Sequence, residues 1–95
     1  MKYAARKDAN QETIVKALRK MGATVTSVHQ IGNGLPDILC GFRGKNYLFE
    51  IKDGNKSPSR RKLTEDEERW MERWQGHSHV VKSVDEAINI LMGKE

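Results

Sequence analysis

Apolar residues in the first part of the chain recur at helical spacing. Ile14, Val15, Leu18 and Met21 share one helical face, Asn10 stands where an N-cap is expected, and Gly22 follows as a stop signal. The pattern therefore predicts a helix that begins after residue 10 and ends before residue 22.

The pattern then changes to that of strands separated by turns. Residues 23–30 are rich in β-branched side chains. In residues 37–42 one face carries Ile38, Cys40 and Phe42, and in residues 46–52 one face carries Tyr47, Phe49 and Ile51. Glycine and asparagine in 32–34, and glycine in 43–45, indicate turns between these segments. Three consecutive strands are predicted, of which the last two form a hairpin.

The second half predicts two more helices with a strand between them. Thr64 and Glu67 have capping-box spacing ahead of one helix, and Ser83 and Glu86 repeat it ahead of the last. Residues 79–82 read as a short strand. The order is α-β-β-β-α-β-α, which indicates an α/β fold: a small mixed sheet flanked by helices.

The helix that follows Thr64 carries an apolar stripe of Trp70, Met71 and Trp74. Tryptophans at this spacing favour a place in the core or in an interface over a base-stacking platform. Gly76 is expected to end this helix.

Length and composition narrow the class of protein. The chain of 95 residues predicts a single domain over 1–95. No apolar stretch is long enough for a membrane span, and the basic start lacks the apolar run of a signal peptide. The single cysteine, Cys40, excludes an internal disulfide and suits a reducing cytoplasm, so a cytoplasmic protein is expected.

Basic residues outnumber acidic residues, 17 to 13, giving a net charge of +4 that favours a polyanionic partner. Lys52, Lys56, Arg60, Arg61 and Lys62 follow one another with a single acid among them. Glycine, proline and serine in the same segment predict a loop, which is either simply solvated or a phosphate-contacting loop.

Candidate chemistry is concentrated in residues 34–54. Asp37 follows Pro36 at the start of one predicted strand, and Glu50 and Lys52 share one face of the next. Because the two strands form a hairpin, Asp37 is expected to lie near Glu50 and Lys52. Two carboxylates without imidazole or thiolate suit a hard cation such as Mg²⁺ or Mn²⁺, and a lysine beside them can assist a water molecule. Glu50 and Lys52 taken alone would indicate only a surface salt bridge.

The pattern Pro36-Asp37 followed by Glu50-Ile51-Lys52 resembles the PD-(D/E)XK nuclease superfamily. The later run from Lys62 to Thr64, leading into Glu67 and Trp70, resembles its VRR-NUC branch, which is frequent in phages and DNA-repair nucleases. Members of that branch often carry glutamine where this chain has Glu67. The resemblance implies a restriction-endonuclease-like core and a cytoplasmic setting in a bacterium or a phage-infected host.

The resemblance also implies roles for individual residues. Asp37 and Glu50 would ligate the metal, the Ile51 carbonyl would complete its shell, and Lys52 would be the catalytic lysine. Glu12 on the first helix stands where the superfamily often adds an acid. Its alternative role is to complement the helix dipole.

Together these observations predict a divalent-metal-dependent endodeoxyribonuclease with no organic cofactor. No helix shows a base-reading face, so branched DNA such as a Holliday junction is the expected substrate, cut by a homodimer. The alternative is a non-catalytic, basic nucleic-acid-binding module of the same fold. The expected phosphate contacts are Lys2, Arg6, Lys7, Lys56, Arg60, Arg61 and Lys62.

Overall fold

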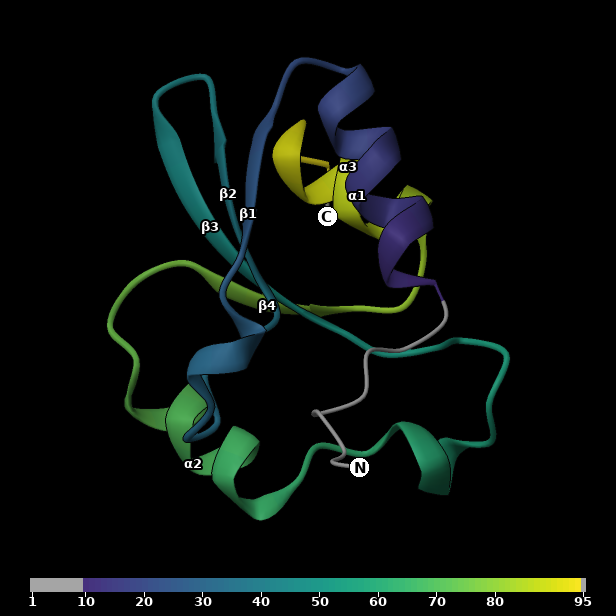
Figure 1. The fold of residues 1–95 in the computed structure, drawn as a ribbon, viewed down its shortest axis with the longest axis vertical. Helices are drawn as coiled ribbons and strands as arrows, with labels where there is room; N and C mark the ends of the chain where they lie inside the picture. The colour runs from purple at the N-terminus through teal and green to yellow at the C-terminus, as the bar shows by residue number, and fades with distance from the viewer. Residues whose placement is uncertain (1–9, 95) are drawn as a thin grey trace.

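The computed structural model describes residues 10–94 and shows one four-stranded sheet with helices (Figure 1). The order of elements along the chain agrees with the predicted order α-β-β-β-α-β-α, with two short 3₁₀ helices in addition. The elements are α1 (Gln11–Lys20), β1 (Thr24–Ser27), η1 (His29–Ile31), β2 (Ile38–Phe42), β3 (Lys45–Ile51), η2 (Pro58–Arg61), α2 (Glu65–Arg73), β4 (Ser78–Val81) and α3 (Val84–Leu91).

The sheet is mixed, with the spatial order β1-β2-β3-β4. β1, β2 and β3 form an antiparallel meander, whereas β4 runs parallel to β3 after the crossover that contains α2. Ile38 lies opposite Phe49 in the hairpin of β2 and β3, and this register fixes which side chains meet at its open end.

The core lies between α1, α3 and one face of the sheet. Both helices lie on the same side of the sheet in Figure 1. Ile14 and Leu18 of α1 are fully buried, and they belong to one apolar cluster with Ile38, Phe49 and Val81 of the strands. Since α1 and α3 cover this face, a ligand can reach the sheet only from the opposite face.

For the first third of the chain, the N-cap position is confirmed and the bounds of the first strand are wrong. Asn10 is the N-cap residue of α1, but its side chain does not cap the helix. It instead donates to the carbonyl oxygens of Lys52 and Lys82, both at 3.1 Å, and so fastens α1 to the ends of two strands. The strand predicted over 23–30 stops at Ser27, because the backbone leaves the extended region at Val28 and enters η1.

The helix α2 also differs from expectation. The predicted capping box of Thr64 and Glu67 is confirmed, but the helix ends at Arg73, ahead of Gly76. None of its residues is buried, and Trp74 is 44% exposed. Of the two predicted places for the tryptophans, core or interface, the structure therefore contradicts the core, and the interface stays a prediction. No helix in the described part of the chain is long and apolar enough to cross a membrane.

The last helix begins with half of the predicted capping box. The Ser83 hydroxyl accepts from the Glu86 amide at 3.1 Å, as expected. The Glu86 carboxylate, however, accepts from the Lys82 amide at 2.7 Å, one residue before the N-cap. This arrangement still fixes the connection between β4 and α3.

Candidate active site

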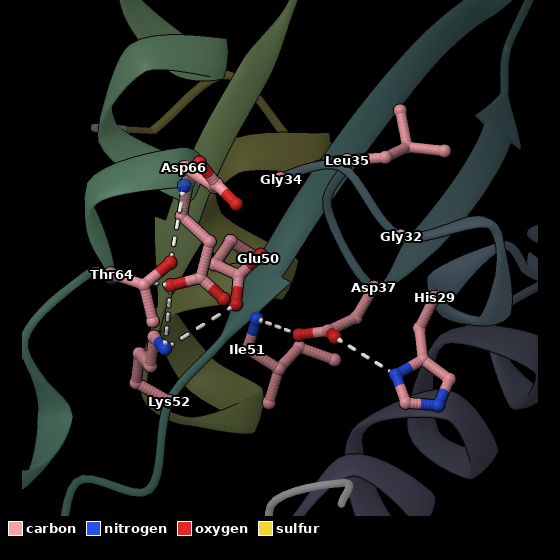
Figure 2. A pocket seen from close by; sticks show the side chains of 11 residues that line it. His29, Gly32, Gly34, Leu35, Asp37, Glu50, Ile51, Lys52, Thr64 and Asp66 are labelled. Carbon is pink, nitrogen blue, oxygen red and sulfur yellow. Dashed lines mark hydrogen bonds and ion pairs between the residues drawn. The ribbon is translucent and has the colours of Figure 1, made fainter. Parts of the chain in front are cut away.

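The open end of the hairpin of β2 and β3 brings the predicted residues together. Because Ile38 is paired with Phe49, the next step of the antiparallel register places Asp37 opposite Glu50 on the same face of the sheet. Lys52 follows two residues after Glu50 and shares this face. Figure 2 shows Asp37, Glu50 and Lys52 around one pocket, as the sequence predicts.

Asp37 is held by the backbone of the neighbouring strand. Its amide donates to the Phe49 carbonyl at 3.0 Å, and its Oδ2 accepts from the Ile51 amide at 2.7 Å. Its Oδ1 lies 3.8 Å from Nδ1 of His29. Burial raises the pKa of Asp37, although the Ile51 hydrogen bond and His29 act in the opposite direction.

Glu50 is the most deeply buried acid of the site, with only 3% of its surface exposed. Burial raises the pKa of Glu50 to about 9, and the nearby carboxylates of Asp37 and Glu67 add to the rise. Lys52 lowers it, with its Nζ 3.5 Å from Glu50 Oε2. At neutral pH this carboxyl therefore binds a proton in the absence of another cation.

Lys52 lies between two carboxylates. Besides Glu50, its Nζ contacts Oε1 of Glu67 at 3.0 Å. The same Glu67 oxygen accepts from the Thr64 amide at 2.9 Å, so one carboxylate both caps α2 and holds the lysine. Burial alone would raise the pKa of Glu67, but the Thr64 amide and Lys52 outweigh it and lower that pKa.

The pocket has a volume of about 250 Å³. One wall is η1 and the loop that follows it, the opposite wall is the first turn of α2, and the end of β3 lies between them. Gly34 lies so close to α2 that a Cβ would overlap the Asp66 carbonyl, and its φ of +86° also favours glycine. The loop and the helix are thus fitted to each other around the pocket.

The main chain at Ile51 contributes to the same spot. The Ile51 amide points toward Asp37, and the carbonyl of a strand residue lies on the same side as its amide. The Ile51 carbonyl therefore faces the Asp37 side of the pocket, where the resemblance requires it.

The donor set suits a hard divalent cation. Asp37, Glu50 and Glu67 carry three carboxylates against the single ammonium of Lys52, and burial makes this excess of negative charge costly. Oxygen donors of this kind select Mg²⁺ or Mn²⁺ over soft metals. Within residues 10–94, no group of three His, Cys, Asp or Glu side chains is arranged to hold an ion. The oxygen donors that could hold one here are Asp37, Glu50 and a peptide carbonyl.

Of the other predicted residues, Glu12, Lys56 and Lys62 are described by the structure and do not line this pocket. Glu12 is exposed on the first turn of α1 and is not among the residues around the pocket. Lys56 and Lys62 are exposed, one on each side of η2, and Arg60 and Arg61 belong to η2 itself. Lys2, Arg6 and Lys7 lie outside the described residues.

The sequence reasoning missed the place of His29 and the contact that Glu67 makes. The sequence assigns His29 no role in the pocket, because nothing in it shows that η1 folds back over the start of β2. Glu67 had a complete local role in the capping box, which concealed its contact with Lys52. Both contacts depend on packing between segments that are distant in sequence.

No protein-family model, curated protein or solved structure matches this chain in the three comparisons that we made.

Proposed function

We propose that this protein is a divalent-metal-dependent endonuclease that hydrolyses phosphodiester bonds in DNA. The observation that supports the proposal best is the convergence of Asp37, Glu50 and Lys52 on one pocket at the open end of the hairpin. The resemblance of the same residues to the PD-(D/E)XK pattern supports it independently, and would make the fold a restriction-endonuclease-like core of VRR-NUC type.

Asp37, Glu50 and the Ile51 carbonyl would hold the cation. A bound Mg²⁺ or Mn²⁺ ion would polarise a phosphate oxygen and activate a water molecule. The hydrogen bond from the Ile51 amide fixes the Asp37 carboxylate, so this ligand is oriented before anything binds. Glu12, which the resemblance also implies as a ligand, does not line the pocket and has no part in this proposal.

Lys52 would act on the attacking water or on the phosphate. As an ammonium, Lys52 can orient the water or neutralise charge that develops on the phosphate. As a neutral amine, it can accept a proton from the water. Glu67 keeps Nζ at the edge of the pocket through the 3.0 Å contact. Lys52 is therefore the catalytic lysine of the proposal, and Glu67 supports its position.

DNA is the proposed substrate because basic residues follow the catalytic strand in the sequence. The segment from Lys52 to Lys62 directly follows the catalytic strand, and its lysines and arginines can contact phosphates on either side of the cut. Lys2, Arg6 and Lys7 are proposed to add to these contacts. No described helix has an Arg- and Asn-rich face for base reading, so selection would follow DNA structure, and Holliday junctions or other branches are the proposed targets.

A two-fold homodimer would complete this assignment. One chain of 95 residues has little surface for both arms of a branched duplex, whereas a dimer presents two sites in a fixed arrangement. Two paired nicks would then follow from symmetry. The faces proposed for the contact are the α2 helix with its tryptophans and the end of α3 around Leu91 and Met92.

The alternative, a non-catalytic clamp, explains the pocket less well. A clamp binds phosphates with cations, but this pocket holds a buried Glu50 beside two other acids, which repel phosphate unless a cation lies between them.

A nicking assay on linear duplex, flap and four-way junction substrates tests the proposal. We expect cleavage with Mg²⁺ or Mn²⁺, preference for a branched substrate, and no cleavage in EDTA. Binding without cleavage of any substrate, in either metal, would favour the clamp instead.

A further inference from the structure

A second pocket lies on the same face of the sheet as the candidate active site. Its volume is about 410 Å³, and its walls come from β2, from the first half of β3 and from the residues that follow α2. We call it the apolar pocket, and define it by Leu39, Lys45, Asn46, Leu48, Trp74 and His77. No catalytic or metal-binding role proposed above uses it, although Trp74 also belongs to the α2 face proposed for the dimer contact.

Shared strands and a shared helix connect the apolar pocket to the active site. Glu50, Leu48 and Asn46 follow one another at every second position of β3, so all three lie on one face. At about 3.4 Å per residue, Leu48 lies roughly 7 Å and Asn46 roughly 14 Å along the strand from Glu50. The first turn of α2 lines the active site, and Trp74 at its C-cap lines the apolar pocket.

The pocket offers an aromatic ring that the protein itself leaves half covered. The Trp74 indole stacks on Trp70 with ring centroids 4.8 Å apart and planes 20° from parallel, yet 44% of Trp74 remains exposed. Gly76 lies beside it, where a Cβ would come within 2.9 Å of the indole nitrogen. On the other side, Leu39 is 41% exposed and lies opposite the buried Leu48.

The charge of the apolar pocket is opposite to that of the active site. No aspartate or glutamate is among the described residues that line it, and Lys45 gives it a positive charge. Asn46 and His77 are exposed at its rim and can donate or accept hydrogen bonds. An aromatic ring, an apolar wall, polar groups at the rim and one cation form the combination by which proteins hold a base of a single strand.

We propose that the apolar pocket binds one unpaired nucleobase of the DNA strand whose phosphate lies at Glu50 and Lys52. The inference rests on the proposed function and deepens it, because this pocket would let the protein distinguish branched DNA from a continuous duplex. A paired base remains in its stack and cannot enter, whereas a base at a junction or bulge is released at little cost. Trp74 and Leu39 hold the base, and Lys45 contacts a neighbouring phosphate.

Binding measured in EDTA tests this separately from cleavage. The probes are a fluorescent duplex with a one-base bulge, the same duplex with an abasic residue at the bulge, and the fully paired duplex. We expect the wild-type protein to bind the bulged base more tightly than the abasic probe. Trp74→Ala should weaken binding of the bulged base by roughly five- to 150-fold, the value of one stacked base, and should leave the other two probes unchanged.

Matched variants keep the result interpretable. Trp74→Phe retains an aromatic ring and should restore most of the affinity. Val80→Ala shortens a similarly exposed apolar side chain on β4 that lines neither pocket, and should change nothing. If Trp74→Ala does not fold, Leu39→Asp places a carboxylate in the same pocket and should abolish the preference for the base.

Equal affinity of the wild-type protein for the bulged and abasic probes would overturn the inference. So would dissociation of a dimer by Trp74→Ala with the base preference intact, because a second copy of the chain would then cover the pocket. A protein that binds the bulged base through Trp74 but never cuts DNA would instead contradict the proposed function and leave the inference standing.

Discussion

Replacing Glu50 by glutamine should make the metal-free protein more stable while destroying its activity. Burial and two neighbouring acids raise the pKa of Glu50 to about 9, against 4.5 for an ordinary glutamate. Between these two pH values the folded chain binds one proton more at this group than the unfolded chain. The contribution of this group to the free energy of unfolding is therefore fully present below pH 4.5 and is lost as the pH rises toward 9.

The size of the effect follows from this difference. A pH of 7.5 is three units above the pKa of this carboxyl in the unfolded chain. Each unit corresponds to about 1.4 kcal/mol, so the wild-type protein loses at most about 4 kcal/mol of unfolding free energy at this pH. Glutamine has the shape of the protonated acid and needs no proton, and Lys52 keeps its 3.0 Å contact with Glu67. Imperfect replacement of the hydrogen bonds reduces the gain, so we expect about 2 kcal/mol, or roughly 8–16 °C in Tm.

Thermal unfolding in EDTA at pH 5 and pH 7.5 measures this gain, with Glu65→Gln as the control. Glu65 is 87% exposed and contacts only Arg69, at 3.9 Å, among the ion pairs that the structure shows, so its replacement should change Tm little at either pH. Glu50→Gln should be clearly more stable than wild type at pH 7.5 and nearly equal to it at pH 5.

Added Mn²⁺ should reverse the order of the two proteins. The cation replaces the proton in the wild-type pocket and stabilises it by about 2.7 kcal/mol at a hundred times its Kd, whereas Glu50→Gln has lost a charged ligand. The reasoning would be refuted if Glu50→Gln behaved like Glu65→Gln in EDTA, or if both responded to Mn²⁺ as wild type does.

Three further predictions concern the lysine, the basic loop and the assembly. Lys52→Ala should still show the heat of Mn²⁺ binding in calorimetry, while the nicking rate falls by orders of magnitude. The reason is that the ammonium acts on water or phosphate and is not a metal ligand. A near-normal nicking rate would indicate that Glu50 and Lys52 form only a salt bridge. Neutralising Arg60, Arg61 and Lys62 together should lower the log–log salt slope of duplex binding by about 0.9 for each lost phosphate contact, and an unchanged slope would show a merely solvated loop. Sedimentation at micromolar concentration should find a dimer, and a single-chain species that still cuts both strands of a four-way junction would contradict it.

The helix and strand order followed from the sequence because the apolar periods are strong. Helical spacing in 10–21 describes a helix that is buried on one side. The strand Lys45–Ile51 is buried on both faces from Tyr47 onward, which is why its sequence is mostly apolar there. The strand over 23–30 was overextended because β-branched composition does not reveal that Val28 leaves the extended region. The spacing of Trp70 and Trp74 left core and interface open, because apolar spacing indicates a shared face but not what that face contacts.

The site was predictable as far as one hairpin determines it. Register and the period of two place Asp37 opposite Glu50 and Lys52 beside it, and both rules can be applied to the sequence. His29 and Glu67 reach the pocket from η1 and α2, whose positions depend on the packing of Gly34 against Asp66. The raised pKa of Glu50 also needs the fold, since it results from burial and from acids on other segments.

The most direct measurement of the central claim is the cleavage of a four-way junction by the wild-type protein and by Asp37→Asn, each with Mg²⁺ and with excess EDTA. Asparagine keeps an oxygen for the Ile51 amide, so the fold should be retained while a charged metal ligand is lost. We predict cleavage by the wild-type protein in Mg²⁺ alone and a loss of at least about 1,000-fold in Asp37→Asn, each ~1.4 kcal/mol of lost transition-state stabilisation being tenfold. Full cleavage in EDTA, or wild-type rates in Asp37→Asn, would contradict the account.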